Sequence, residues 1–317
     1  MAPKKRPYSP NGTAYTTKLG CCIQGKIEDV LKKRSFSQYK SHIDLIFTSP
    51  PFPLNRKKKY GNLNEQEFID WFSSQSVLFS ELLSDHGSIV IEMGNSWNRG
   101  SPTMSTLALR ALLGFLQEGD LHLCQQFIWF NTAKLPTPAP WVTIDRIRVK
   151  DAFTNIWWMS KTERPKADNR RILLEYSDKM KGVIKNGKYN SGRRPSNHKI
   201  SNQGFLTDNG GAIPPNVLIS SNTESQSQYL KYCRKNKIHP HPARMPIDIP
   251  NFFIKFLTDP NDLVLDPYSG SNTTGHACED LGRQWISVEP NTDYIRGSIG
   301  RFTQQHIKVN KNFERFT

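Results

Sequence analysis

A strand, a tight turn, a helix and a second strand follow one another in residues 263–289, and this unit restricts the chain to a parallel α/β fold. An apolar triplet runs into Asp266, and Gly270 then lets the backbone turn sharply. Apolar patterning predicts a helix over 276–281 and a strand over 284–289. Two parallel strands joined by a crossover helix end at the same edge of a sheet, where α/β proteins bind their ligands.

The end of this unit predicts a nucleoside site. Glu289 follows Gly270 by 19 residues (289 − 270), close to the spacing at which an acidic residue binds ribose hydroxyls. The turn contains neither G-x-G-x-x-G nor a P-loop, and no lysine is placed to hold phosphates. A nucleoside without phosphate, such as S-adenosylmethionine, therefore fits better than a dinucleotide or ATP. A purely structural turn remains an alternative, in which Thr273 and Thr274 simply cap the helix.

A second strand end, in residues 43–52, carries a stiff loop. The apolar run reads as a buried strand and ends in Thr48, Ser49, two prolines and Phe52. Prolines cannot continue the hydrogen-bond ladder of a sheet, so the backbone is held rigid where the strand stops. Rigid carbonyl groups beside a projecting aromatic ring suit the binding of a flat ring that carries an exocyclic amine. A simple loop entry would show the same two prolines.

Strands and helices alternate along most of the chain, as in a parallel α/β sheet. Residues 1–17 are expected to be a flexible, basic lead-in, and a helix is expected over 102–118. The strands at 122–130 and 154–160 are expected to pair at one edge of the sheet. From 161 to 236 the periodicity fades, and the segment is polar, basic and rich in Gly, Asn and Ser.

The charge balance predicts a polyanionic partner. The chain has 43 Lys and Arg against 28 Asp and Glu, a net charge of +15. Twelve basic and four acidic residues lie between Lys161 and Gln203, so this stretch alone carries +8. A second basic cluster, residues 56–59, directly follows the proline-rich loop. Such clustering favours contacts with DNA phosphates over a merely basic surface.

Cysteine usage and hydropathy predict a cytoplasmic protein without a metal site. The five cysteines form no C-x-x-C pair and show no disulfide-like spacing, which is typical of a reducing compartment. His239 and His241 have no partners at ligand spacing, so we expect no metal. No apolar run approaches the ~18 residues of a membrane span, and the basic N-terminus lacks the apolar stretch of a signal peptide.

Both loops resemble motifs of one protein family. Residues 48–52, Thr-Ser-Pro-Pro-Phe, resemble the catalytic S-P-P-[YF] motif of the DNA amino-methyltransferases, and residues 266–275, DPYSGSNTTG, resemble their D-P-F-x-G-S-G-T-T cofactor loop. The catalytic motif precedes the cofactor motif, which is the order of the circularly permuted β group of site-specific, cytosine-N4 enzymes. Further matching stretches extend over nearly the whole chain: 56–63, 129–131, 134–136, 148–152, 208–211 and 241–244.

The resemblance implies the S-adenosylmethionine-dependent methyltransferase fold, a Rossmann-like α/β sheet that is circularly permuted. Residues 1–160 would form the catalytic half of the sheet and 237–317 its cofactor-binding half. Residues 161–236 would be an inserted target-recognition region that lies against the major groove of DNA.

The resemblance also implies roles for individual residues. Ser49 and the Pro50 carbonyl would bind the amine of the target base, within a loop completed by Pro51, and Phe52 would stack on the flipped base. The residues expected to bind S-adenosylmethionine are Asp266, Pro267, Tyr268, Ser269, Gly270, Asn272, Thr273, Thr274, Glu289, His241, Pro242 and Ala243. The residues expected to contact DNA are Arg56, Lys57, Lys58, Arg193, Arg194 and His198.

The predicted reaction is methyl transfer to the N4 amine of cytosine in double-stranded DNA. Methylation of carbon-5 needs a Pro-Cys pair, and no cysteine here follows a proline. Transfer to adenine N6 remains an alternative, although enzymes of that kind more often carry Asp or Asn at the position of Ser49. An inactive DNA-binding protein is a second alternative, because Lys26 stands where the family usually has an acidic residue.

The resemblance implies a biological setting as well. The enzyme would act as a monomer on a short palindrome, for which CAGCTG is the suggestion if the likeness extends through residues 161–236. It would protect DNA from a restriction endonuclease that acts on the same site.

Many relatives have Gly at the position of Asn272, and the chain departs from the family pattern there as well as at Lys26.

Overall fold

The computed structural model describes residues 12–52, 65–201, 203–223, 226–302 and 307–314. Contacts between residues divide the chain into two compact units. The main unit contains residues 1–167 and 216–317, and the inserted unit is Asp168–Pro215. The predicted recognition region, 161–236, is wider than the inserted unit, because residues 216–236 pack with the main unit.

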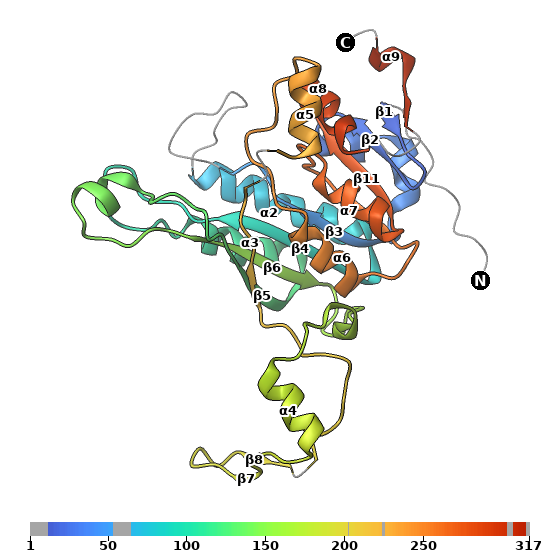
Figure 1. The fold of residues 1–317 in the computed structure, drawn as a ribbon. Coiled ribbons are helices and arrows are strands. Elements are labelled where there is room, and N and C mark those ends of the chain that lie inside the picture. Colours follow the sequence, from blue (N-terminus) through green and yellow to red (C-terminus); the bar gives the residue numbers. More distant parts are fainter. Residues whose placement is uncertain (1–11, 53–64, 202, 224–225, 303–306, 315–317) are drawn as a thin grey trace. The chain divides into compact units, whose positions relative to one another are not determined.

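A ten-stranded sheet is the centre of the described part of the main unit (Figure 1). Its strands run in the order β12, β1, β2, β11, β10, β3, β4, β6, β5 and β9. From β2 to β4 neighbouring strands are parallel, whereas β6 is antiparallel to both β4 and β5. The strands are β1 (Thr13–Thr16), β2 (Gly20–Gln24), β3 (Ile43–Thr48), β4 (Leu83–Gly94), β5 (His122–Phe130), β6 (Phe153–Ser160), β9 (Val217–Ile219), β10 (Leu263–Asp266), β11 (Gln284–Glu289) and β12 (Lys308–Val309).

Helices cover both faces of this sheet. Alternate strand residues such as Leu263 and Leu265 join the core that contains Phe72 of α2 and Phe115 of α3. On the other face, the ring of Phe47 lies 5.8 Å from that of Phe253 in α6. The helices are α1 (Ile27–Leu31), α2 (Glu65–Leu82), α3 (Leu107–Gly119), α5 (Gln228–Lys235), α6 (Asp248–Leu257), α7 (Thr273–Leu281), α8 (Thr292–Ser298) and α9 (Lys311–Glu314). No helix among the described residues combines the length and the apolar character needed to cross a bilayer.

Two expectations about local structure are wrong. Thr13–Thr16, expected within a flexible lead-in, form β1, where the buried Tyr15 hydroxyl lies 2.7 Å from Ser298 Oγ. The helix expected from residue 102 begins at Leu107, because the backbone before it forms a tight turn in which Asn98 N donates to the Thr103 carbonyl at 2.9 Å. The pairing of β5 with β6 is confirmed, but β9 adds a further strand outside them.

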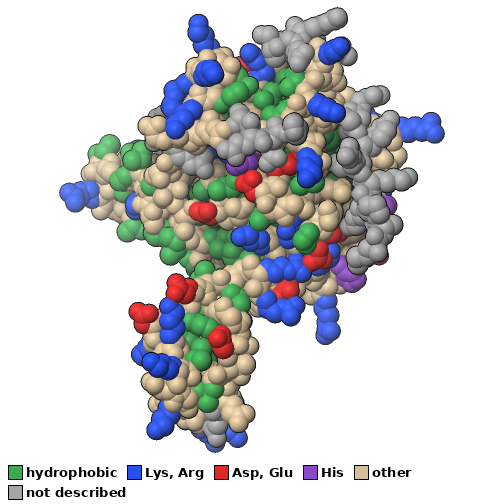
Figure 2. All heavy atoms as spheres, turned by 45° about the vertical axis from the view of Figure 1, so that its right-hand side comes forward, with side chains coloured by type: hydrophobic (Ala, Val, Ile, Leu, Met, Phe, Trp, Pro, Cys, Tyr) green, Lys and Arg blue, Asp and Glu red, His purple; other side chains and the backbone are tan. Residues whose placement is uncertain are grey.

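The inserted unit is small and basic. It contains α4 (Asp178–Asn186), capped by the Ser177 hydroxyl, and the short strands β7 (Gly192–Arg193) and β8 (Lys199–Ile200). Nine Lys and Arg and four Asp and Glu give this unit a net charge of +5 (9 − 4). Lys and Arg side chains are spread over much of the face displayed in Figure 2, with fewer acidic ones among them.

Candidate active site

The two sequence motifs meet in the middle of the sheet. Strands β3 and β10 are parallel neighbours, with Leu45 opposite Val264 and Ile46 opposite Leu265. Their carboxyl ends therefore lie side by side. At that edge the Thr48 hydroxyl donates to Asp266 Oδ1 at 2.8 Å, a contact between residues 218 positions apart. The proline-rich loop and the glycine-containing loop consequently line one site.

The buried carboxylate of Asp266 forms hydrogen bonds with residues of both loops. Besides the bond from Thr48, its carboxylate accepts from the Thr274 hydroxyl at 2.6 Å and from the backbone N–H of Tyr268 at 3.2 Å. Burial raises the pKa of Asp266 to about 6, although these three donors oppose the rise. Of the predicted cofactor residues, Asp266 and Thr274 thus bind each other and fix the shape of the turn.

The turn after β10 uses two left-handed residues. Gly270 has φ +51°, and a Cβ there would approach the ring of His241 to 3.0 Å. Asn272 has φ +56° and is fully buried; its side chain accepts from the Gly275 N–H at 3.0 Å. The helix cap is therefore Asn272, and the expectation that Thr273 and Thr274 cap α7 is wrong. Asn is one of the few residues other than Gly that adopt this left-handed backbone routinely.

Glu289 closes the turn from the next strand. One of its carboxylate oxygens accepts from Gly270 N and the other from Asn291 N, both at 2.9 Å. Burial raises the pKa of Glu289 to about 7. Each oxygen retains a further lone pair for a ligand hydroxyl.

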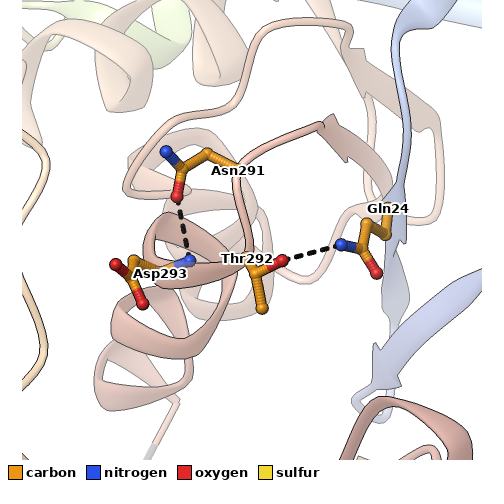
Figure 3. Close-up of a pocket in the computed structure, with 4 residues that line it drawn as sticks. All are labelled: Gln24, Asn291, Thr292 and Asp293. Carbon is orange, nitrogen blue, oxygen red and sulfur yellow. Dashed lines mark hydrogen bonds between the residues drawn. The ribbon is translucent and has the colours of Figure 1, made fainter. Parts of the chain in front are cut away.

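A hollow of about 570 Å³ opens beside these residues. It is lined by Gln24, Asn291, Thr292 and Asp293, at the carboxyl ends of β2 and β11, where Glu289 pairs with Gln24. Figure 3 shows Gln24 donating to the Thr292 hydroxyl at 2.9 Å and the Asn291 side chain accepting from Asp293 N at 2.9 Å. The polar groups at this edge suit the hydroxyls and ring nitrogens of a nucleoside.

The predicted segment 241–243 reaches this loop from the side. The ring of His241 lies edge-on to that of Tyr294 at 4.5 Å, and its Nδ1 bonds to the carbonyl of Ala243. Pro242 between them is exposed. His241 thus covers Gly270, as expected for a wall of the cofactor pocket.

Beneath Tyr268 lies an aromatic residue that sequence reasoning missed. The ring of Trp71, from α2, lies 5.7 Å from the ring of Tyr268. The Trp71 indole N–H donates to Glu28 at 2.8 Å. Glu28, one of the acidic residues near Lys26, is therefore tied to the wall beneath the cofactor loop. A half-buried tryptophan on a helix gives no sequence signal that separates it from core residues.

Ser49 is exposed at the end of β3 and donates to Glu92 Oε2 at 2.5 Å. Burial raises the pKa of Glu92 above its usual value, opposed by the bond from Ser49 and by the charge of Lys134. Sequence reasoning missed Glu92. The available signal was a lone carboxylate within the apolar strand β4, which pairs with β3 in the structure.

A second hollow, of about 300 Å³, lies at the carboxyl end of β4, where Gly94, two residues after Glu92, lines it. Phe52 lines it from the proline-rich loop and packs edge-on against Phe68 at 5.9 Å. Pro50 is buried and Pro51 exposed. The remaining lining residues are Gly94, Asn95, Trp97, Lys134, Thr137, Pro138 and Asp151. Two aromatic residues, Phe52 and Trp97, thus share this hollow with polar and charged side chains.

The predicted DNA-contacting residues are distributed over other parts of the chain. Arg56, Lys57 and Lys58 lie outside the described residues. Arg193, Arg194 and His198 lie in the hairpin of the inserted unit, where Arg194 N donates to the His198 carbonyl at 2.8 Å and all three side chains are exposed.

Comparison with known proteins agrees with this geometry. A family model described as DNA methylase matches residues 43–300. The chain is 44% identical over 300 residues to the type II methyltransferase M.PvuII of Proteus hauseri, covering 94% of this chain and 88% of the relative. The type II methyltransferase M.HpaI of Haemophilus parainfluenzae is 25% identical over 81% of this chain and 67% of its own.

The fold matches solved structures as well. The structure titled PvuII DNA methyltransferase (cytosine-N4-specific) superposes with a TM-score of 0.73 and 37% identity over 96% of this chain and 92% of that one. The resemblance to the DNA amino-methyltransferases, and among them to the PvuII modification methyltransferase, is therefore confirmed, as is the methyltransferase fold. Parallel strands that end at Thr48 and Asp266, and a family model spanning both, lead to one conclusion: this chain belongs to the DNA methylase family.

Proposed function

We propose that this enzyme transfers a methyl group from S-adenosylmethionine to the N4 amine of a cytosine in a specific double-stranded DNA site. The observation that carries the proposal is the hydrogen-bonded pair of Ser49 and Glu92, beside a nucleoside-type loop on the neighbouring strands. The 44% identity to M.PvuII supports it, since the matching structure is titled cytosine-N4-specific.

The donor set of the cofactor loop fits S-adenosylmethionine. Glu289 offers carboxylate lone pairs, and it follows the glycine turn by the number of residues expected of an acid that binds ribose hydroxyls. The hollow beside Asn291 supplies amide and hydroxyl groups. None of the described residues that line that hollow is a lysine or an arginine, in agreement with a ligand that has no phosphate. The methionine end would lie against the Gly270 turn, near Thr273 and His241. When bound, the cofactor supplies an electrophilic methyl group.

Ser49 and Glu92 prepare the amine for attack. A cytosine amine is a weak nucleophile because its lone pair is delocalised into the ring. Since the Ser49 hydroxyl donates to Glu92, its own lone pairs are free to accept an N–H of the amine. The Pro50 carbonyl accepts the other N–H, and the nitrogen then approaches a tetrahedral shape with its lone pair pointing outward.

Glu92 also provides a place for the proton that the amine must lose. Its pKa is raised by burial, which makes its carboxylate a better base than an exposed one. The proton can pass from the methylated amine to Ser49 Oγ as the serine proton passes to Glu92. Phe52 holds the flipped base by stacking, and positioning supplies most of the rate.

Further elements of the proposal concern partners. We assign the inserted unit, with its net charge of +5, to target recognition, and CAGCTG to the target sequence. A cognate endonuclease would cut the same site without forming a stable complex, and a monomer can methylate one strand of a palindrome at a time. The five free thiols fit a cytoplasmic enzyme.

Incubation with plasmid DNA and S-adenosylmethionine, followed by digestion to nucleosides and mass spectrometry, tests the proposal. We expect N4-methylcytosine, and protection of CAGCTG sites from an endonuclease that cuts there. Detection of N6-methyladenine instead would show that adenine, and not cytosine, is the substrate base. Binding of DNA without any methylated nucleoside would favour the inactive DNA-binding alternative. Ser49→Ala is the matched control and should bind the cofactor normally.

A further inference from the structure

Lys134 carries a positive charge into the hollow beside Ser49. It lies in the loop after β5, and its Nζ is 3.9 Å from Asp151 Oδ2, with 30% of its side chain exposed. That distance exceeds hydrogen-bond reach, and no closer polar partner of this ammonium is found among the described residues. All three of its N–H donors are therefore available to a ligand in the hollow.

The surroundings hold the ammonium in this position. Asp151 is 13% exposed, and its other oxygen accepts from the Asn95 amide at 2.9 Å. Asn95 in turn accepts from the amide of Asn155 on β6 at 2.9 Å. A hydrogen bond from Asp151 N to the Thr137 carbonyl at 2.9 Å closes the loop between β5 and β6 that contains Lys134. Lys134 is thus attracted toward a carboxylate that is itself anchored on the sheet.

Lys134 is connected to the Ser49–Glu92 pair by charge and to Phe52 by the hollow that both line. The charge of Lys134 acts on Glu92, which accepts the hydrogen bond from Ser49. Phe52 and Lys134 both line the hollow. A base whose amine lies at Ser49 and whose face lies on Phe52 would therefore present its remaining edge to Lys134.

We propose that Lys134 reads the ring edge of the flipped cytosine by donating hydrogen bonds to its O2 and N3 atoms. This inference rests on the proposed function and adds a specificity-determining residue to it. Beyond its amine, cytosine presents two acceptors, N3 and O2, whereas adenine presents N1 and then a C–H group. An ammonium donor at this edge therefore favours cytosine over adenine.

Binding measurements separate base reading from catalysis. Duplexes that contain the mapped target site would carry cytosine, adenine or an abasic residue at the methylated position. Fluorescence anisotropy would measure their affinities for the full-length protein with sinefungin, a non-reactive analogue of the cofactor. Lys134→Met should weaken binding of the cytosine duplex by about tenfold, that of the adenine duplex less, and that of the abasic duplex not at all.

Lys150→Met is the matched control. Lys150 is an exposed lysine of the same loop, and its Nζ donates to the Lys134 carbonyl at 3.4 Å without lining the hollow. This substitution removes one positive charge from the loop and should change the three affinities by equal factors. If thermal melting shows that Lys134→Met is unfolded, Lys134→Gln, which keeps a neutral donor, should show the same ranking with smaller factors.

Equal weakening of all three duplexes by Lys134→Met would overturn the proposal and leave Lys134 as a phosphate contact or a support of Glu92. Failure of the proposed function is a separate result, since it would appear in the unmodified enzyme as an absence of N4-methylcytosine.

Discussion

At the scale of residues, the site gathers carboxyl groups where parallel strands end. Asp266, Glu289 and Glu92 come from three strands, and burial raises the pKa of each. Each is held by hydrogen bonds from neighbours instead of by an ion pair at contact distance. The pKa values of Asp266 and Glu289, about 6 and about 7, therefore lie closer to neutrality than those of ordinary carboxyl groups.

The affinity for S-adenosylmethionine should rise with pH through about 7, the pKa of Glu289. An ionised carboxylate accepts a ribose hydroxyl more strongly than a protonated one. At pH 6 only about one Glu289 in eleven would be ionised, so binding should be about tenfold weaker there than at pH 8. Isothermal titration calorimetry at the two values measures this difference.

Glu289→Gln should remove most of that pH dependence. A dependence that persists unchanged in the variant would assign it to another group. In the free protein, Glu289 holds its proton at pH values where the unfolded chain has lost it. The free energy of unfolding should accordingly fall as the pH rises from about 4.5 to about 7, by up to ~1.4 kcal/mol per pH unit.

Phe52→Ala should reduce turnover by about tenfold or more, because the flipped base loses its stacking surface and stacking contributes about 1–3 kcal/mol. The cofactor loop does not depend on this ring, which packs edge-on against Phe68. The dissociation constant for S-adenosylmethionine should therefore stay within about twofold. Steady-state methylation and cofactor titration measure the two quantities, and unchanged turnover would refute the stacking role.

At the scale of elements, the turn between β10 and α7 is constrained by one residue, Asn272. Asn272 combines a left-handed backbone, the cap of α7 and bonds to two other buried groups. Its amide donates to the Tyr15 hydroxyl at 2.9 Å and accepts from the Ser287 hydroxyl at 2.6 Å. The turn is thus connected to β1 and β11 as well as to its own helix.

Asn272→Ala should lower the free energy of unfolding by about 3–4 kcal/mol. The loss combines a strained left-handed alanine, the missing cap and two buried hydroxyls without their partner. Asn272→Gly keeps the backbone geometry and should cost about 1 kcal/mol less. Urea unfolding of both variants measures the difference, and equal losses would show that the left-handed backbone contributes little.

The sequence predicted the elements that bear periodic apolar residues, and with them the two loops. It did not predict Glu92 or Lys134, because each reaches the site only through the lateral order of the strands and loops. It also assigned the cap of α7 to Thr273 and Thr274, since backbone handedness at Asn272 cannot be read from residue types alone. Local patterns therefore predicted the two loops that meet in the candidate site, while the contact of Glu92 with Ser49 required the order of the strands in the sheet.

At the scale of the whole molecule, the charge is divided unevenly between the units. The inserted unit carries +5 within Asp168–Pro215, a segment whose contacts are mostly its own. Its start at 168 and end at 215 could not be derived from composition, because the polar segment continues into the main unit, up to β9 and α5.

Replacement of residues 168–215 by a short Gly/Ser linker should leave cofactor binding within about twofold and abolish site-specific methylation. The salt dependence of DNA binding should become shallower, since phosphate contacts set its slope. Calorimetry and affinity measurements at several salt concentrations test this. Retained methylation at the original site would place target recognition in the main unit.

The position of β10 and β11 between β2 and β3 has a consequence for synthesis of the protein. During translation, residues 20–24 and 43–48 leave the ribosome early, but the strands that join them, 263–289, are made near the end. Until then the nascent chain holds two separate sheet fragments with open edges. Catalysis must wait for the final tenth of translation, and chains cut short by a stalled ribosome should be inert and prone to aggregate.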